Sequence, residues 1–322
     1  MFKKILISSA FLLVATAGIA SAEALKVDKS LKNYKAVGGV SGNLNSIGSD
    51  TLNNLMTMWA EGFRKKYPNV NIQVEGKGSS TAPPALVAGT AQLGPMSREM
   101  KNSEIDAFAK KYGYKPTRIA VAIDTIALFV NKDNPVKSLS MEQIDALFSK
   151  NRKRGYPSNI TTWGQLGVTG KMAAQPISLY GRNSASGTYG FFKEIALSKG
   201  DFKNIVKEQP GSASVVQGIT KDKNGIGYSG IGYKTSGVKI LPVSAKAGKP
   251  AFEATYANAL NNKYPLSRFL YIYIAKNPKK PLPKLTEEFL TFVLSKEGQE
   301  IVIKDGFLPL TEKLSAKSRS AL

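Results

Sequence analysis

The sequence predicts an α/β protein with two doubly wound α/β domains joined by crossing strands. Segments typical of strands alternate with segments of helical periodicity along the whole chain, which favours an α/β fold with largely parallel sheets. The roughly 300 residues from 23 to 322 are enough for two domains of ordinary size. No internal repeat, low-complexity block or long linker separates two halves, so we expect strands rather than a flexible tether to connect the domains.

The first 22 residues have the pattern of a secretory signal peptide. Lys3 and Lys4 precede a mostly apolar run from 5 to 20, and Ala20-Ser21-Ala22 has the A-x-A form of a cleavage site. The apolar run is short for a membrane span, which takes about 20 apolar residues. The alternative is an uncleaved anchor. No comparable run follows Glu23, so we expect a soluble mature chain.

The first third of the mature chain predicts a loop, a helix, a strand and a short helix. Residues 25–45 are polar and contain glycine, as in a loop or a short first strand. From Leu52, apolar side chains recur at spacings of three and four and form one stripe that ends before Pro68. Residues 69–76 alternate as in a half-buried strand, and residues 82–93 predict a short helix opened by prolines.

The rest of the chain continues the alternation. Residues 118–135 are rich in β-forming residues, and they predict one strand or two strands that meet at Asp124. Residues 138–148 predict a helix with a capping box formed by Ser140 and Gln143. Further strands are expected at 175–181, 225–234, 237–243 and 267–276, and further helices at 188–197 and 284–304.

Two residue types are missing, and their absence excludes several kinds of chemistry. The chain has no cysteine, which excludes disulfides, thiolate catalysis and a lipid-modified cysteine. It has no histidine, which excludes serine–histidine triads, histidine-ligated zinc and imidazole acid–base catalysis. The segment "GYSGIG" (227–232) lacks the G-x-S-x-G spacing of a nucleophile turn. We therefore expect no catalytic residue, no metal and no cofactor.

The chain is strongly basic. Its formal charge is +22, and it becomes +20 when the two lysines of residues 1–22 are removed. Such a charge favours anionic partners, namely nucleic acid, acidic lipid or wall polymers, or small anions. The lysines are scattered rather than gathered in long blocks, so no specific nucleic-acid partner is expected.

Three segments share one pattern, in which a strand end or glycine is followed by small hydroxyl residues and a helix. They are "GSDT" (48–51), "GKGSSTAP" (76–83) and "RNSASGT" (182–188). A helix N-terminus presents unpaired N–H groups and the positive end of its dipole, which favour an anion. Ordinary helix capping explains the same residue types. Three such turns in one chain, together with Arg182, predict a site for a small tetrahedral anion.

The order and spacing of segments along nearly the whole mature chain resemble the periplasmic phosphate-binding proteins of phosphate ABC importers. The segments are "GSDT…W", "GKGSSTA", "LGPMSREM", "AIDTIALFVNKDNP", "ITTWGQL", "GRNSASGTYGFFKE", "GIGYSGIGY", "YPLSRFLYIYI", "SKEGQ" and "GFLPL". The resemblance implies a monomeric, periplasmic binding protein of the type II-like fold. Its two domains close like a hinge on inorganic phosphate, which it hands to a membrane permease.

The resemblance also implies a set of ligand-binding positions. Arg182, Ser186, Gly187 and Thr188 match the family's arginine-to-S-G-T segment without gaps, and Ser79 matches the serine after a strand-ending glycine. The phosphate-binding residues expected are Ser49, Asp50, Thr51, Ser79, Ser80, Ser97, Arg98, Arg182, Ser186, Gly187 and Thr188.

Ser97 departs from the family pattern, because many members place there an aspartate that accepts the proton of hydrogen phosphate. A buried carboxylate favours protonated phosphate over fully ionised sulfate. We hypothesise that Asp50 has taken over this role; the alternative is that Asp50 only caps a helix. Arg98 either adds a second cation to the pocket or pairs with a surface carboxylate.

The expected crossings near Asp124 and Arg268 divide the chain into residues 23–123 with 268–322 and residues 124–267. Three other functions stay open. The site could take another oxyanion such as sulfate, molybdate or tungstate. The chain could act on phosphate esters through a carboxylate-held metal or an activated serine. It could also adhere to polyanions through its charge.

Overall fold

The computed structural model describes residues 25–322, so the predicted signal peptide lies outside the described residues. Its helices are α1 (Asn53–Arg64), α2 (Ala82–Ala88), α3 (Asn102–Tyr112), α4 (Met141–Phe148), α5 (Gly187–Ile195), α6 (Ser212–Lys221), α7 (Tyr256–Leu260), α8 (Lys284–Val293), α9 (Lys296–Lys304) and α10 (Glu312–Arg319). Its strands are β1 (Gly42–Ile47), β2 (Val70–Glu75), β3 (Gly94–Met96), β4 (Thr117–Asn131), β5 (Leu139–Ser140), β6 (Ser178–Arg182), β7 (Lys207–Gln209), β8 (Gly225–Gly230), β9 (Val238–Leu241), β10 (Val243–Ser244), β11 (Ala251–Phe252) and β12 (Ser267–Ile274).

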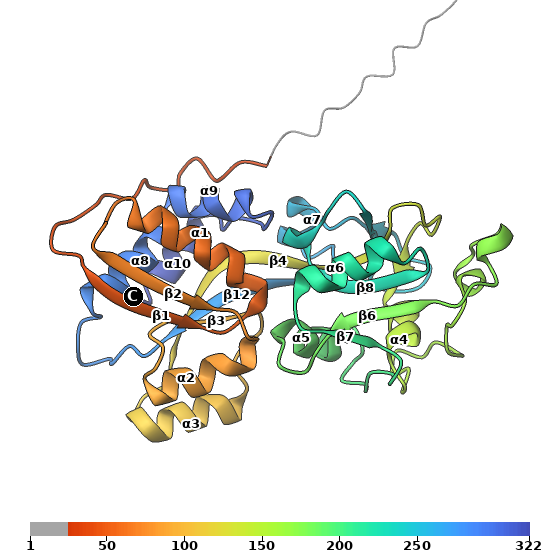
Figure 1. The fold of residues 1–322 in the computed structure, drawn as a ribbon, viewed down its shortest axis with the longest axis horizontal. Helices are drawn as coiled ribbons and strands as arrows, with labels where there is room; N and C mark the ends of the chain where they lie inside the picture. Colours follow the sequence, from red (N-terminus) through yellow and green to blue (C-terminus); the bar gives the residue numbers. More distant parts are fainter. Residues whose placement is uncertain (1–24) are drawn as a thin grey trace, which may run out of the picture.

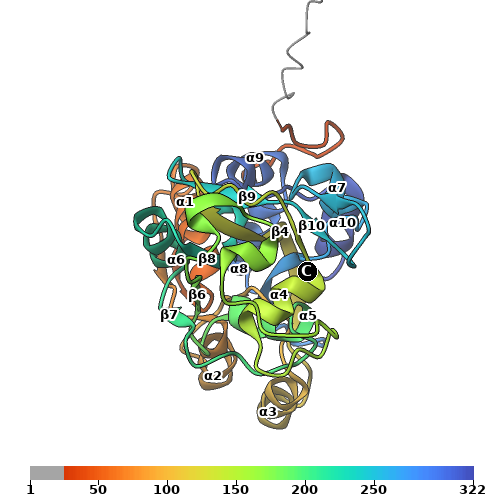
Figure 2. The ribbon, with the colours of Figure 1, turned by 90° about the vertical axis from the view of Figure 1, so that its right-hand side faces the viewer.

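The chain forms two lobes that lie side by side and share two long strands (Figure 1). Lobe I contains β1–β3, α1–α3 and α8–α10, and lobe II contains α4–α6 and β5–β11. The strands β4 and β12 run from one lobe toward the other. The helices α2 and α3 project from lobe I as a pair, as both perpendicular views show (Figure 2).

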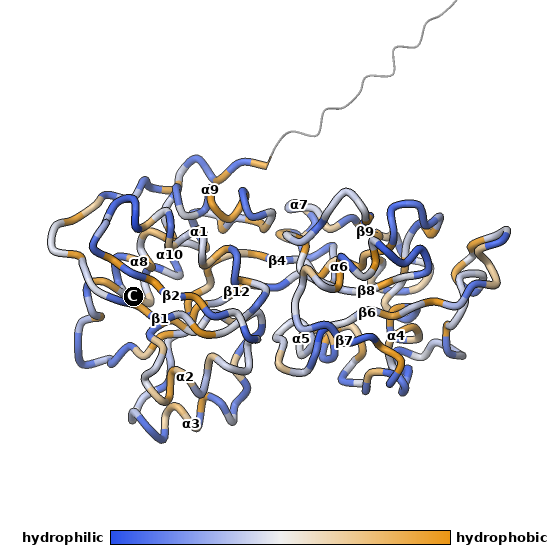
Figure 3. The backbone as a smooth tube through the Cα atoms, in the orientation of Figure 1, coloured by the Kyte–Doolittle hydropathy of each residue, from blue (hydrophilic) through white to orange (hydrophobic). Residues whose placement is uncertain are grey.

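The segment from 118 to 135 is one strand rather than two. β4 is continuous through Asp124, and every side chain from Val121 to Asn131 is buried. Its first half pairs with β12, and its second half pairs with β8 and β9. One strand therefore contributes to the core of both lobes, and Figure 3 shows it as a hydrophobic segment.

The main sheet is mixed, so the expectation of largely parallel sheets is wrong. Its strand order is β3-β12-β4-β8-β6-β7, and all pairings of β4 and β12 are antiparallel. The pairings of β6 with β7 and with β8 are parallel, as is the pairing of β1 with β2. The reason is the connectivity: β4 enters lobe II and β12 returns to lobe I, so the two adjacent strands run in opposite directions.

Several helices form where the sequence predicts them. The predicted stripe of Leu52, Leu55, Met56, Trp59 and Phe63 is fully buried, and α1 carries most of it. The capping box of α4 is present in both directions: Ser140 N donates to the Gln143 side chain, and Gln143 N donates to Ser140 Oγ.

Each lobe has its own apolar core. In lobe I, α1, α8 and α9 pack around Phe63 and Phe292. In lobe II, α4 and α5 pack against β8 through Phe148, Phe192 and Tyr228, and the Phe192 and Tyr228 rings stack at 3.8 Å. Ala259 of α7 packs on the core of lobe I although its neighbours in sequence belong to lobe II. Within residues 25–322 no helix combines the length and apolarity that crossing a membrane requires.

Candidate functional site

A cluster of buried serines lies at the edge of lobe I that faces lobe II. Ser49 Oγ donates to Ser97 Oγ at 3.0 Å, and the Ser79 and Ser97 hydroxyls are 3.1 Å apart. Ser97 N also donates to Ser79 Oγ at 3.0 Å. Ser49 precedes a short 3-10 helix at Asp50–Leu52, and Ser79 opens another at Ser79–Thr81. Two of the predicted turns and the strand β3 thus bring these hydroxyls together.

The N-terminus of α5 in lobe II meets this cluster. A Cβ atom on Gly187 would lie 2.3 Å from Ser79 Oγ and 2.6 Å from Ser97 Oγ. Thr188 Oγ1 is 2.9 Å from Thr51 Oγ1 of lobe I. Ser186 caps α5 by accepting from Thr188 N and Tyr189 N. The three predicted turns, two from one lobe and one from the other, therefore converge at one place.

Arg182 lies beside the cluster at the end of β6. Its side chain is 1% exposed, and Nη2 forms an ion pair with Asp50 Oδ2 of lobe I at 3.1 Å. Nη1 donates to Ser212 Oγ at 2.6 Å, and Nη2 donates to the Pro210 carbonyl. Nε is buried and has no hydrogen-bond partner. Burial lowers the pKa of Arg182, and the Asp50 carboxylate opposes this shift.

Asp50 contacts the N-terminus of α6 as well as Arg182. Its Oδ2 accepts from Ser212 N at 2.9 Å and from Ser212 Oγ at 3.1 Å. Tyr233 Oη donates to the carbonyl oxygens of Asp50 and Thr51. Asp50 therefore joins the lobes and holds Arg182. Ser212 is not among the residues expected from the sequence, although Gly211 and Ser212 open α6 with the same pattern of a glycine and a small hydroxyl residue; what this turn lacks is a cation.

A second arginine with its own aspartate lies on the other side of Thr188. Arg268 on β12 and Asp124 on β4 are directly opposite in the strand register. Nε and Nη2 of Arg268 donate to Asp124 Oδ2 at 3.0 and 2.7 Å. Burial raises the pKa of Asp124 and lowers that of Arg268, and each partner opposes the shift of the other. The sequence indicated these residues only as strand crossings.

Arg98 and Ser80 lie at the outer side of the cluster. Both terminal nitrogens of Arg98 donate to Glu104 at 2.7 Å, and Nη2 also donates to Ser80 Oγ at 3.3 Å. Ser80 N donates to the Ala185 carbonyl of lobe II. Of the two alternatives for Arg98, the structure has the pairing with a carboxylate.

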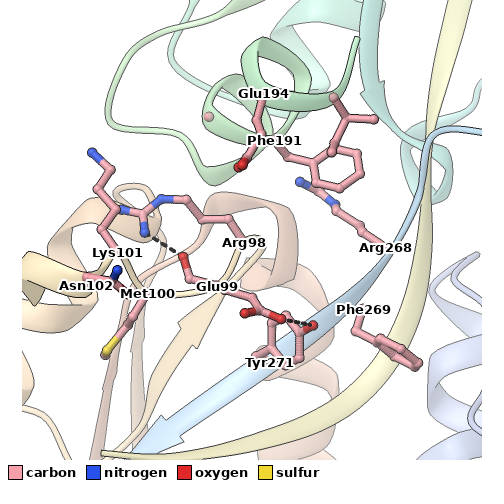
Figure 4. A pocket seen from close by; sticks show the side chains of 12 residues that line it. Arg98, Glu99, Met100, Lys101, Asn102, Phe191, Glu194, Arg268, Phe269 and Tyr271 are labelled. Atoms are coloured by element: carbon pink, nitrogen blue, oxygen red, sulfur yellow. Dashed lines mark hydrogen bonds between the residues drawn. The ribbon is translucent and has the colours of Figure 1, made fainter. Parts of the chain in front are cut away.

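A cavity of about 620 Å³ opens between the lobes beside the cluster. Figure 4 shows its labelled side chains: Arg98, Glu99 and Lys101 come from lobe I, Phe191 and Glu194 come from α5, and Arg268 lies between the two groups. Burial there raises the pKa of Tyr271 above its usual range, and its Oη donates to Glu99.

The arrangement is suited to binding an oxyanion. It combines hydroxyls, a helix N-terminus and guanidinium groups, which are the donors that tetrahedral anions require. The hydroxyls bond to one another, and each arginine has a carboxylate beside it. Within residues 25–322, no group of three or more carboxylates is placed to hold a metal ion.

Comparison with known proteins places this chain in a family. The model of the PBP superfamily domain matches residues 33–297. A protein named phosphate-binding protein PstS from Pseudomonas aeruginosa PAO1 is 57% identical over 310 residues, which cover 96% of each chain. A relative of the same name from Staphylococcus epidermidis RP62A is 30% identical and covers 81% of this chain and 77% of its own.

Solved structures give the same result. A putative phosphate ABC transporter substrate-binding protein from Clostridium perfringens, solved with bound phosphate, has a TM-score of 0.70 and 29% identity, and the match covers 84% of this chain and 100% of that one. An ABC-type phosphate transport receptor from Vibrio cholerae shares the fold at a TM-score of 0.63 and 23% identity, over 83% of this chain and all of its own. These matches confirm the resemblance that the order of the motifs indicates. The chain belongs to the PBP superfamily and, within it, to the PstS family of phosphate-binding proteins.

Proposed function

We propose that this chain captures inorganic phosphate between its two lobes and delivers it to an ABC importer. The observation that carries the proposal is the meeting of donors from both lobes: Gly187 of α5 lies against Ser79 and Ser97, beside the buried Arg182 with its unpartnered Nε. The names of the relatives from Pseudomonas aeruginosa and Clostridium perfringens support phosphate as the ligand and an ABC transporter as the partner.

The proposed roles follow from what each group offers. Arg182 supplies charge-assisted hydrogen bonds, and the N–H groups at the start of α5 bind a phosphate oxygen. The remaining donors are the hydroxyls of Ser49, Thr51, Ser79, Ser97, Ser186 and Thr188. Asp50 holds Arg182 through Oδ2, and we keep the hypothesis that its Oδ1 accepts the proton of hydrogen phosphate. Arg98, although paired with Glu104, and Ser80 line the outer side and are proposed to offer hydrogen-bond donors to an entering anion.

Closure is proposed to be a hinge motion of two domains, residues 23–123 with 268–322 and residues 124–267. The position of Asp124 and Arg268 on the strands shared by the lobes supports this division. The cross-lobe bonds of Asp50 with Ser212 and of Thr51 with Thr188 would break on opening.

Another fully ionised oxyanion, such as sulfate, is the second candidate ligand. Ser97 favours it, because a hydroxyl that can donate stands where many family members have an acceptor carboxylate. An enzyme is not proposed, since the chain has no histidine or cysteine and the hydroxyls of Ser49, Ser79 and Ser97 bond to one another rather than to a base. The N-terminal pattern supports export to the periplasm, and we propose a freely diffusing monomer without a nucleic-acid partner.

Calorimetric titration of ligand-stripped protein with phosphate, sulfate and arsenate tests this function. We expect saturable phosphate binding at one site per chain, arsenate binding with a slightly lower affinity, and no comparable sulfate signal. A sulfate affinity equal to or above that of phosphate would favour the second candidate. Absence of all three signals would refute oxyanion binding.

A further inference from the structure

Arg268 stands between the cavity and the buried hydroxyl cluster. On one side it lines the cavity of about 620 Å³, with its guanidinium 5.3 Å from the centroid of the Phe191 ring (Figure 4). On the other side Nη2 donates to Thr188 Oγ1 at 2.9 Å. An anion that moves from this cavity to Thr188 therefore passes the guanidinium.

The same side chain contacts both lobes and the strands that join them. Nη1 donates to the Ser97 carbonyl of lobe I at 2.5 Å, while Nη2 reaches Thr188 of lobe II. Its remaining bonds go to Asp124 on the neighbouring strand. These contacts use four of the five N–H donors that a guanidinium carries.

An ion pair with a purely structural role would not require the Arg268 guanidinium to reach the Ser97 carbonyl and the Thr188 hydroxyl. A buried pair stabilises little by itself, because desolvation of the two charges offsets their attraction. Arg268 and Asp124 would satisfy one another as a cross-strand pair without reaching Ser97 or Thr188. The side chain extends instead to the hydroxyl that also bonds Thr51.

We propose that Arg268 is a second phosphate-binding guanidinium, oriented by Asp124, which takes the anion from the cavity and couples its binding to closure of the hinge. The inference rests on the proposed function. It adds a ligand contact on the shared strands, outside the turns that carry the other donors. Phosphate replaces the Thr188 hydroxyl as the partner of Nη2. Its binding therefore acts directly on Arg268 of β12 and, through the ion pair, on Asp124 of β4.

The test compares the wild type with Arg268→Lys, with the charge-neutral double variant Asp124→Asn/Arg268→Gln, and with a matched control. The control, Glu312→Gln/Arg319→Gln, likewise removes one arginine–carboxylate pair without changing the net charge, at a less buried position in α10. Each protein is titrated with phosphate by calorimetry. Its melting temperature and its radius of gyration from X-ray scattering are measured with and without phosphate.

We expect Arg268→Lys to lose about 30-fold in phosphate affinity and the double variant about 100-fold, because charge-assisted hydrogen bonds to the ligand are lost. The control should stay within about threefold. If Arg268 has only a structural role, its substitution should lower the melting temperature measured without phosphate. The rise in melting temperature and the compaction that phosphate causes should then remain. If Arg268→Lys, folded as judged by circular dichroism, keeps wild-type affinity and compaction, the inference is overturned, even where the double variant does not fold. A wild type that binds no phosphate would instead refute the proposed function itself.

Discussion

Gly187→Ala is the most direct test of the geometry in which α5 meets lobe I. The added Cβ would lie 2.3 Å from Ser79 Oγ and 2.6 Å from Ser97 Oγ, whereas ordinary contacts are about 3.5 Å. Gly187 has no positive φ, so alanine fits the backbone of α5 itself. The substitution should therefore leave lobe II folded and hinder only the approach of the two lobes.

The magnitude follows from the distance by which α5 must retreat. Relieving both contacts moves its N-terminus by roughly 1 Å, which lengthens donor–acceptor distances from about 2.9 Å to about 3.9 Å, beyond hydrogen-bonding range. Hydrogen bonds to a charged ligand contribute about 1.5–3 kcal/mol each. Losing one or two of them costs about 3 kcal/mol, which corresponds to roughly a 100-fold weaker phosphate affinity.

Calorimetry measures the affinity, and X-ray scattering with and without phosphate measures closure. Gly190→Ala is the matched control in the same helix, since its Cβ would meet only the flexible Arg98 side chain at 3.3 Å. We expect this control to bind within about threefold of wild type and to melt slightly higher, because alanine favours the helix interior. Wild-type affinity and closure in Gly187→Ala would refute the idea that phosphate is bound with α5 against Ser79 and Ser97.

Three further predictions use the same assays. Arg182→Ala should weaken phosphate binding by about 100-fold or more, since it removes a bidentate donor, and unchanged affinity would overturn the site assignment. Asp50→Asn should weaken binding by about tenfold, through the loss of the carboxylate that holds Arg182; if phosphate affinity and sulfate rejection both survive, the proton acceptor lies elsewhere. Burial raises the pKa of Asp305 from an ordinary 3.8 to about 6, against the hydrogen bond from Asn54. The folded chain thus binds this proton more tightly than the unfolded chain, and stability from this group rises as pH falls from about 6 toward 4. Asp305→Asn should raise the melting temperature at pH 7 and lose that advantage near pH 4, so an advantage that does not change with pH would contradict the shift.

The parts of the fold that the sequence predicts are those with strong local signals. The stripe of α1 repeats at helical spacing over three turns, and Ser140 with Gln143 closes a local capping box. By contrast α3 buries only Phe108, and α10 buries only the small polar side chains Ser315 and Ser318. With so few apolar positions, these helices leave almost no periodic pattern in the sequence.

The antiparallel pairing of the shared strands depends on contacts between residues far apart in the chain. Asp124 and Arg268 are neighbours in the sheet although 144 positions separate them. No local pattern reports such a register. One signal could have predicted that Asp124 has a charged partner on a neighbouring strand. Asp124 lies in the middle of the strand-forming run from 118 to 135, and a buried charge requires a partner.

The site shows the same division between local and distant information. The small residues of the turns are recognisable because helix N-termini with Ser, Thr and Gly have a local pattern. That Ser97 lies between Ser49 and Ser79 depends on how β3 is placed relative to two turns from other parts of lobe I. The partner of Arg98 could have been found locally, since Glu104 is six positions away and opens α3.

Because each arginine of the site is paired with an aspartate, the affinity of the site for an anion should depend little on the net charge of the whole chain. Asp50 offsets Arg182, and Asp124 offsets Arg268, so the donors around the cluster add little net charge of their own. Oriented hydroxyls, the N–H groups of α5 and guanidinium hydrogens therefore have to stabilise the anion, and buried donors are hardly screened by salt. The formal charge of +20 on residues 23–322 lies largely on exposed lysines, whose field acts over a Debye length. Salt should consequently slow the arrival of phosphate at the cavity more than it speeds its release from the closed site.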